Sequence, residues 1–232
     1  MNKTDILNKI KAFTIVTGHY GCGKSNLSVN LAIDAAKAGE HVTIVDMDLV
    51  NPYFRTSDYR PLLESYGIDV ITPVFGATNL DIPSLPASMY SIFERDGRVI
   101  VDVGGDDVGS TVLGRFRPQL MNVDYDMLYV INRFRSLTVT PEETVEILRE
   151  IEAVSGLKAT GLINNSHLMS ETTDREIAEG LIYAGEVSKQ TGLKVTANTA
   201  PVKLIGNGGI NAEIIPDLYP VEIYTGPEFN EL

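Results

Sequence analysis

The stretch Ala12-Phe-Thr-Ile-Val-Thr-Gly-His-Tyr-Gly-Cys-Gly-Lys-Ser25 decides the fold of this chain. An apolar run rich in β-branched residues, Ala12–Val16, leads into a turn with three glycines, and a helical pattern follows over Lys24–Ala38. A strand, a glycine-rich turn and a helix in direct succession predict the first unit of an α/β domain. Gly39 follows the helical pattern, as expected of a glycine that ends a helix.

The turn itself, Gly18 to Ser25, matches the pattern G-x-x-x-x-G-K-[ST] in full. Phosphate oxygens need several backbone N–H groups converging on one point, so such a loop curls through φ values that glycine adopts cheaply. The positive end of the following helix adds to this anion site. The alternative is a glycine turn that only starts a helix, and the position between a strand and a helix argues against it.

We therefore expect this loop to bind the phosphates of ATP or ADP. Lys24 is predicted to reach the β- and γ-phosphates, and the Ser25 hydroxyl is predicted to join Mg²⁺. The residues predicted to contact the nucleotide here are Gly18, His19, Tyr20, Gly21, Cys22, Gly23, Lys24, Ser25 and Asn26. Cys22 is either a thiol activated by the positive loop or a small residue packed in a tight turn, and we favour the second interpretation.

Short apolar runs and helical patterns alternate along the rest of the chain. Strands are predicted over Val42–Asp46, Ile68–Thr72, Arg98–Val103, Met127–Ile131, Ala159–Ile163 and Leu193–Ala197, and helices over Pro141–Val154 and Thr173–Thr191. Runs that are apolar on both faces belong in a buried parallel sheet. The predicted fold class is therefore three-layer α/β/α, with a doubly wound, mostly parallel sheet. We expect one domain over residues 1–232, with Ile210–Leu232 as an irregular C-terminal wrap that includes a strand near Val221–Tyr224.

Two of the predicted strands end in carboxylates. Asp46 and Asp48 end the second strand, where a carboxylate can orient a water for attack on the γ-phosphate or hold Mg²⁺ through its hydration shell. Asp102 ends a later strand and is expected in the Mg²⁺ shell, and Gly104 after it lets backbone approach the γ-phosphate. Lys24 and Asp48 are thus the candidate catalytic residues. The candidate metal ligands are Ser25, Asp48 and Asp102.

Together these motifs resemble those of the P-loop NTPases with a deviant Walker A motif, the ParA/MinD/Mrp and nitrogenase-iron-protein group, whose nucleotide-binding domain is also called CobQ/CobB/MinD/ParA. The resemblance covers about Ala12 to Leu204 and includes Gly161-Leu-Ile-Asn-Asn-Ser166. It implies that Asn165, or else Asn164, contacts the adenine edge and that Pro201 backs the base. It also implies that Asp48 positions the attacking water and that Asp46 assists it.

One position departs from this group. The group's signature lysine, which reaches the phosphates of a dimer partner, is replaced by His19, and a neutral histidine supplies no permanent cation. The sequence does not choose which arginine replaces that charge, and it leaves a homodimer as an open expectation. The candidate arginines are Arg55, Arg115, Arg117, Arg133 and Arg135.

Composition limits the partners and the compartment. A net charge of −12 and a pI near 4.7 disfavour nucleic acid and anionic membranes as partners. The single cysteine excludes an intrachain disulfide framework, and no apolar run reaches the roughly 20 residues that span a bilayer. The N-terminus lacks a signal-peptide pattern. We therefore expect a cytoplasmic protein.

Three functions remain open. The leading hypothesis is a nucleotide-dependent switch with slow Mg²⁺-dependent ATPase activity that acts on a protein or maturation partner. The second is an ATP-dependent small-molecule kinase or ligase, similar to dethiobiotin synthetase and the cobyrinate-amidation enzymes, with Thr78, Asn79 and Asp81 lining its acceptor pocket. The third is an ATP-binding module without turnover. Asn164-Asn-Ser-His167 stands where a guanine-binding protein would carry Asn-Lys-x-Asp, so we expect ATP to be preferred over GTP.

Overall fold

The computed structural model describes residues 5–48, 56–72, 87–105 and 107–224. They form one eight-stranded sheet in the order β3-β2-β4-β1-β5-β6-β7-β8, and each of the neighbouring pairs is parallel. The strands are β1 Phe13–Gly18, β2 Val42–Met47, β3 Asp69–Ile71, β4 Arg98–Val103, β5 Tyr125–Ile131, β6 Gly161–Asn164, β7 Val195–Pro201 and β8 Leu218–Val221. The predicted parallel sheet is therefore confirmed.

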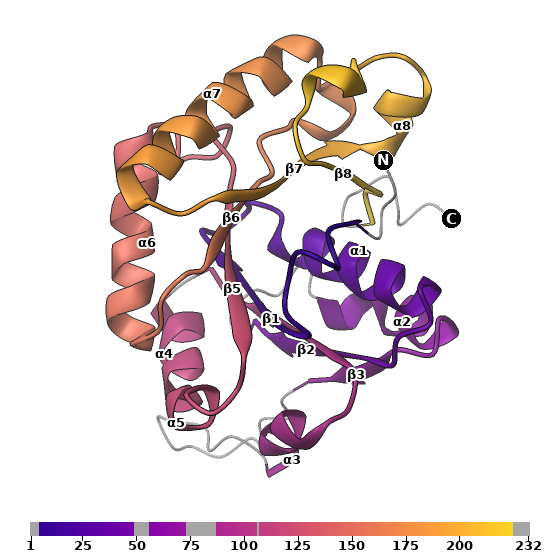
Figure 1. The fold of residues 1–232 in the computed structure, drawn as a ribbon, viewed down its shortest axis with the longest axis vertical. Helices are drawn as coiled ribbons and strands as arrows, with labels where there is room; N and C mark the ends of the chain where they lie inside the picture. The colour runs from indigo at the N-terminus through magenta and orange to yellow at the C-terminus, as the bar shows by residue number, and fades with distance from the viewer. Residues whose placement is uncertain (1–4, 49–55, 73–86, 106, 225–232) are drawn as a thin grey trace.

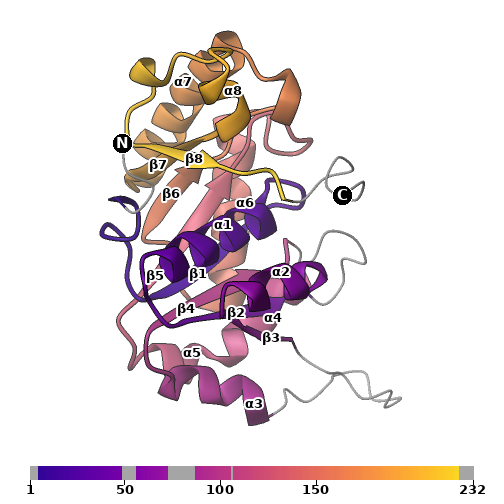
Figure 2. The ribbon, with the colours of Figure 1, turned by 90° about the vertical axis from the view of Figure 1, so that its right-hand side faces the viewer.

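Helices cover both faces of the sheet, which confirms the three-layer architecture (Figures 1 and 2). The α-helices are α1 Lys24–Lys37, α2 Arg60–Ser65, α3 Ala87–Tyr90, α4 Asp107–Arg115, α5 Arg117–Leu120, α6 Pro141–Ser155, α7 Asp174–Thr191 and α8 Val202–Gly206. Short 3₁₀ helices are η2 Thr56–Tyr59, η3 Ser91–Glu94, η4 Met169–Glu171 and η5 Ala212–Ile214. Within the described ranges, none of the helices combines the length and apolar character needed to cross a membrane.

The central strands β1, β2 and β4 are buried on both faces, because successive side chains point to opposite sides of the sheet and helices cover each side. Ile15 and Val101 belong to the core beneath α4, α6 and α7, whereas Val16 and Ile100 belong to the core beneath α1 and α2. The runs predicted as buried strands therefore correspond to strands of this sheet, except that the run Ile68–Thr72 contains β3, an edge strand whose residues are exposed or half-buried.

Local capping sets the helix ends. The Thr140 hydroxyl accepts the backbone N–H of Glu143 at 3.3 Å, and the Glu143 carboxylate accepts the backbone N–H of Thr140 at 3.0 Å. This capping box satisfies two N–H groups that the first turn of α6 leaves without partners. At the end of α1, Gly39 has a φ of 88°, as expected of the glycine that follows a helix.

The C-terminal segment differs from its prediction. The last strand, β8, is Leu218–Val221 rather than Val221–Tyr224, and it pairs with β7. Residues after β8 bond to α1 instead: Glu222 N donates to Asn30 Oδ1 at 2.8 Å, and Tyr224 N donates to Asn26 Oδ1 at 2.8 Å. The prediction was wrong because these partners are side chains of a distant helix, which local sequence does not show.

Helix α4 was not predicted. Its sequence, Asp107-Val-Gly-Ser-Thr-Val-Leu-Gly-Arg115, holds two glycines and several β-branched residues, which are poor helix formers. A Cβ at Gly109 would lie 2.5 Å from Gly104 O, so the glycine lets the helix approach the end of β4 closely. Tertiary packing therefore outweighs local propensity here.

Candidate functional site

The order of the strands places the glycine-rich loop at the centre of the site. Strand β1 lies between β4 and β5, and the sheet extends from β1 in both directions. Because all these strands are parallel, the segments after β1, β4 and β5 leave the same edge of the sheet, where α/β proteins bind ligands. The loop after β1 is thus flanked by the Gly104–Gly105 turn on one side and by residues 132–138 on the other.

Three glycines shape this loop. Gly18, Gly21 and Gly23 have φ values of 149°, 75° and 94°, which L side chains rarely adopt. Two of them also lack space for a side chain: a Cβ at Gly18 would lie 2.4 Å from Val130 O, and one at Gly23 would lie 2.2 Å from Asn165 Nδ2. The glycines of the motif are therefore needed both for conformation and for close packing.

Lys24 and the N-terminus of α1 complete a cationic cradle. Lys24 is only 6% exposed, and its Nζ donates to His19 O at 3.1 Å across the loop. The backbone at the start of the helix adds partial positive charge. A curled glycine loop, a buried ammonium group and a helix N-terminus together fit a phosphate group.

The Gly104–Gly105 turn packs directly on this cradle. A Cβ at Gly105 would lie 2.5 Å from Tyr20 N and 2.8 Å from Lys24 Nζ. The turn therefore touches the loop at its lysine side, where the sequence predicted an approach to the γ-phosphate.

Carboxylates gather beside Ser25. Asp102 is buried and accepts hydrogen bonds from Thr56 Oγ1 at 2.7 Å and from Ser28 Oγ at 3.4 Å. Burial, and then the charge of Asp46, raise the pKa of Asp102 to about 7, and the Ser25 hydroxyl lies close enough to oppose this rise in pKa. The structure thus brings together Ser25 and Asp102, two of the three predicted metal ligands.

Asp46 holds the end of β2. Its carboxylate accepts the backbone N–H groups of Asp48 and Ser57, each at 3.0 Å. Burial is the largest cause of the raised pKa of Asp46. Asp48 is half-buried directly after the strand, and the helper role of Asp46 stays a prediction.

Asn165 lies against the glycine loop. Its Nδ2 donates to Cys22 O at 2.7 Å, and its Oδ1 accepts from Thr199 Oγ1 and from His167 Nε2. Asn164 instead donates to Asn198 Oδ1 at 2.8 Å. Of the two asparagines that the sequence left open, Asn165 is therefore the one in contact with the loop, and its contact with a base stays a prediction. Pro201 is buried at the end of β7.

His167 and Thr199 both bond to Asn165, and the sequence assigned neither of them a role of its own at the site. His167 Nδ1 accepts the backbone N–H of Met169, so its Nε2 carries the proton that is donated to Asn165 Oδ1. Burial, with a smaller effect of the Arg135 charge, lowers the pKa of His167 to about 4. His167 is thus a buried packing residue beside the candidate site, and the only sequence signal for this place is its position two residues after Asn165.

Two side chains of the glycine loop, those of Cys22 and His19, have pKa values that differ from their ordinary values. Burial raises the pKa of the Cys22 thiol more than Lys24 lowers it, and Cys22 is fully buried, which supports the packing interpretation. Burial, followed by the charge of Lys24, lowers the pKa of His19. His19 is therefore neutral near pH 7 and supplies no cation.

Some predicted features lie outside the described residues. One is the segment Asn51–Arg55, which follows Asp48, has a sequence that suggests a switch loop, and holds the candidate arginine Arg55. The others are the acceptor-pocket residues Thr78, Asn79 and Asp81. Among residues 5–48, 56–72, 87–105 and 107–224, no group of three or more histidine, cysteine, aspartate or glutamate side chains could hold a metal ion.

A parallel sheet whose central strand runs through a phosphate-type glycine loop into a helix defines the P-loop class of nucleotide-binding proteins. Within that class, residues 13–178 match the model of the CobQ/CobB/MinD/ParA nucleotide binding domain. The chain belongs to this family, as its motifs predicted. A search of curated proteins gave no match.

Solved structures share the fold at low sequence identity. The signal recognition particle receptor FtsY from Elizabethkingia anophelis in complex with GDP has a TM-score of 0.51 and 16% identity, over 79% of this chain and 55% of that chain. FtsY from Thermotoga maritima has a TM-score of 0.49 and 17% identity, over 83% and 67% of the two chains. The match thus spans about half the length of the first FtsY chain. The likeness to the Elizabethkingia anophelis structure in complex with GDP shows the fold alone.

Proposed function

We propose that this chain binds ATP and hydrolyses it slowly with Mg²⁺, as a nucleotide-dependent switch on a protein or maturation partner. The observation that carries the proposal is the packing of Gly105 on Tyr20 and Lys24. A phosphate held by Lys24 would lie beside this turn, and γ-phosphate contacts of this kind order loops in nucleotide switches. The proposal includes a single domain over residues 1–232, a cytoplasmic location and a homodimer.

The residues of the site have separate roles in this proposal. Lys24 and the backbone of the glycine loop bind the phosphates, and the Ser25 hydroxyl and Asp102 would hold Mg²⁺. Magnesium supplies charge neutralisation at the phosphates when bound. Asp48 orients the attacking water, while Asp46 keeps the end of β2 in place through its bond to the Asp48 backbone.

Phosphate release by Asp48→Ala tests the catalytic part. We expect the variant to release phosphate about a hundredfold more slowly while it still binds ATP, because one positioned acid or base contributes about a hundredfold or more to the rate. Asp124→Ala is the control, because Asp124 is exposed and pairs with Lys11 beyond the opposite ends of the strands. Equal rates in Asp48→Ala and the unmodified protein would remove Asp48 from the mechanism.

Competition between ATP and GTP tests the base assignment. We expect ATP to displace a bound fluorescent nucleotide at lower concentration than GTP does, since the segment after β6 lacks the guanine pattern. Preferential GTP binding would discard the assignment of Asn165 to adenine. A chain that binds ATP and never releases phosphate with any partner would select the module without turnover.

A further inference from the structure

The loop after β5 forms a tight turn beside the glycine loop. Phe134 N donates to Asn132 Oδ1 at 3.0 Å, and Thr138 Oγ1 donates to Asn132 O at 2.8 Å. Val130, near the end of β5, is in register with Gly18. The two arginines of this turn, Arg133 and Arg135, are thus held close to the candidate phosphate site by the backbone.

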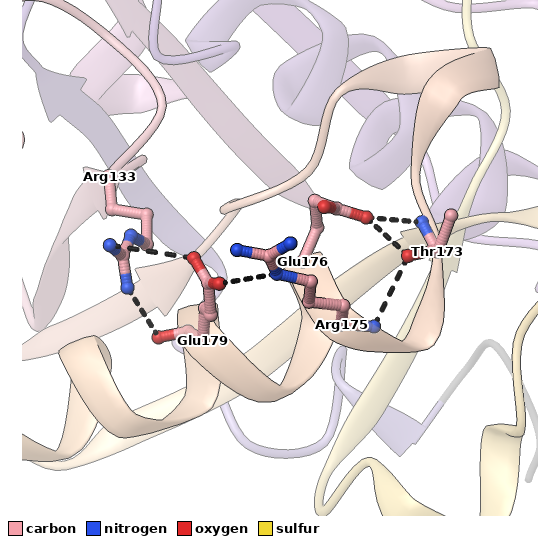
Figure 3. Close-up of polar contacts among 5 residues, drawn as sticks. All are labelled: Arg133, Thr173, Arg175, Glu176 and Glu179. Carbon is pink, nitrogen blue, oxygen red and sulfur yellow. Dashed lines mark hydrogen bonds and ion pairs between the residues drawn. The ribbon is translucent and has the colours of Figure 1, made fainter.

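Arg133 contacts Glu179 on helix α7 rather than the candidate phosphate site (Figure 3). Its Nη1 donates to Glu179 O at 3.3 Å, and its Nη2 lies 3.5 Å from Glu179 Oε2 on helix α7. Glu179 also accepts a 3.0 Å bond from Arg175 Nε, as the same view shows. Arg133 therefore has a structural partner of opposite charge.

Arg135 packs against the glycine loop itself. Its Cδ lies 3.8 Å from the position that a Cβ of Gly21 would take. Its Nε is buried and has no hydrogen-bond partner, and none of the ion pairs among the described residues involves this side chain. A buried donor on a cation carries a free-energy penalty until an acceptor is supplied, and an anion would be the matching acceptor.

The position of Arg135 indicates which phosphates it would reach. The Gly104–Gly105 turn contacts the loop at Tyr20 and Lys24, the lysine side. Arg135 lies instead at Gly21, and its charge acts on His167, which bonds to Asn165 on the predicted base side. Arg135 therefore lies between Gly21, in the middle of the glycine loop, and His167 on the predicted base side.

We propose that Arg135 binds, within the same chain, the α- and β-phosphates of the nucleotide held by the glycine loop. This inference rests on the proposed nucleotide binding and adds a ligand that the glycine motif does not contain. A guanidinium group suits the task because it presents several N–H donors in a plane to phosphate oxygens. Since ADP and ATP share these two phosphates, both should depend on Arg135 equally.

Matched substitutions test the assignment. Arg135→Met and Arg133→Met both keep an apolar stem and remove the charge. Dissociation constants for ATP, ADP and inorganic pyrophosphate are measured by calorimetry on the full chain, and phosphate release is measured at saturating ATP. We expect Arg135→Met to weaken ATP and ADP alike by about 10- to 100-fold, the range for one charge-assisted contact. Arg133→Met should stay within about twofold of the unmodified protein.

Thermal melting separates a binding role from a structural one. Without nucleotide, Arg135→Met should melt no lower than the unmodified protein, because it removes an unpaired buried donor. The inference is overturned if Arg135→Met binds ADP normally, or if it lowers only phosphate release at saturation, which would indicate a γ-phosphate role. If the unmodified protein binds no nucleotide at all, the proposed function itself is wrong, and the assignment of Arg135 falls with it. Should Arg135→Met not fold, Arg135→Lys replaces it, with a smaller loss of ADP affinity expected.

Discussion

Gly105→Ala adds one methyl group at the contact on which the switch proposal depends. The φ of Gly105 lies outside the left-handed region, so alanine fits its backbone conformation. The effect is therefore one of space. The new Cβ would lie 2.5 Å from Tyr20 N and 2.8 Å from both the His19 carbonyl carbon and Lys24 Nζ.

The structure sets the size of the effect. A relaxed carbon–nitrogen contact needs about 3.4 Å, so the turn and the loop must separate by roughly 0.9 Å. The Lys24 side chain can swing away, but the loop backbone cannot retreat easily because Gly18 already abuts Val130 O. Helix α4 blocks the turn from behind, where Gly109 abuts Gly104 O.

Overpacking of this kind destabilises a protein by about 1–3 kcal/mol. A shift of about 1 Å between catalytic groups lowers activity by about a hundredfold. We therefore expect Gly105→Ala to melt lower than the unmodified protein and to release phosphate about a hundredfold more slowly. The measurements are thermal melting, ATP affinity and phosphate release at saturating ATP.

Gly185→Ala is the matched control. The substitution is identical, but Gly185 lies on α7 with nothing within 4 Å of the added Cβ. A helical glycine replaced by alanine should raise stability by up to about 1 kcal/mol and leave phosphate release unchanged. Wild-type turnover and melting in Gly105→Ala would refute the reasoning. A lower melting temperature with unchanged turnover would make the contact purely structural.

Two further predictions concern stability. Because the raised pKa of Asp102, about 7, exceeds the value of 3.8 for an unperturbed aspartate, the folded protein keeps a proton that the unfolded chain releases. The free energy of unfolding should therefore fall from about pH 4 to about pH 7, by up to about 1.4 kcal/mol per pH unit. Asp102→Asn should flatten this slope when unfolding by urea is measured at several pH values. Identical slopes in the two proteins would contradict the prediction. Asn30→Ala should lower the free energy of unfolding by about 2 kcal/mol, because it removes both hydrogen bonds between Asn30 and the Glu222 backbone. A loss below about 0.5 kcal/mol would show that these two bonds contribute little to stability.

Local patterns predicted much of the fold because the responsible interactions are local. Both ends of strand β4, Arg98–Val103, agree with the prediction, and helix α6 begins at Pro141 as predicted. Helix α4 and strand β8 were missed or misplaced because close packing at Gly109 and pairing with β7 decide them. Neither contact leaves a periodic pattern in its own segment.

The amino-acid sequence by itself determined the glycine-rich loop, the helix after it and the family, because these depend on residues that are neighbours along the chain. Tertiary structure alone decided that Asn165 rather than Asn164 meets the loop, and that Arg135 rather than Arg133 packs on Gly21. Both outcomes depend on which strands lie beside β1 and on which side chains at the ends of those strands contact the glycine loop. Contacts between segments more than a hundred residues apart in the sequence settle both.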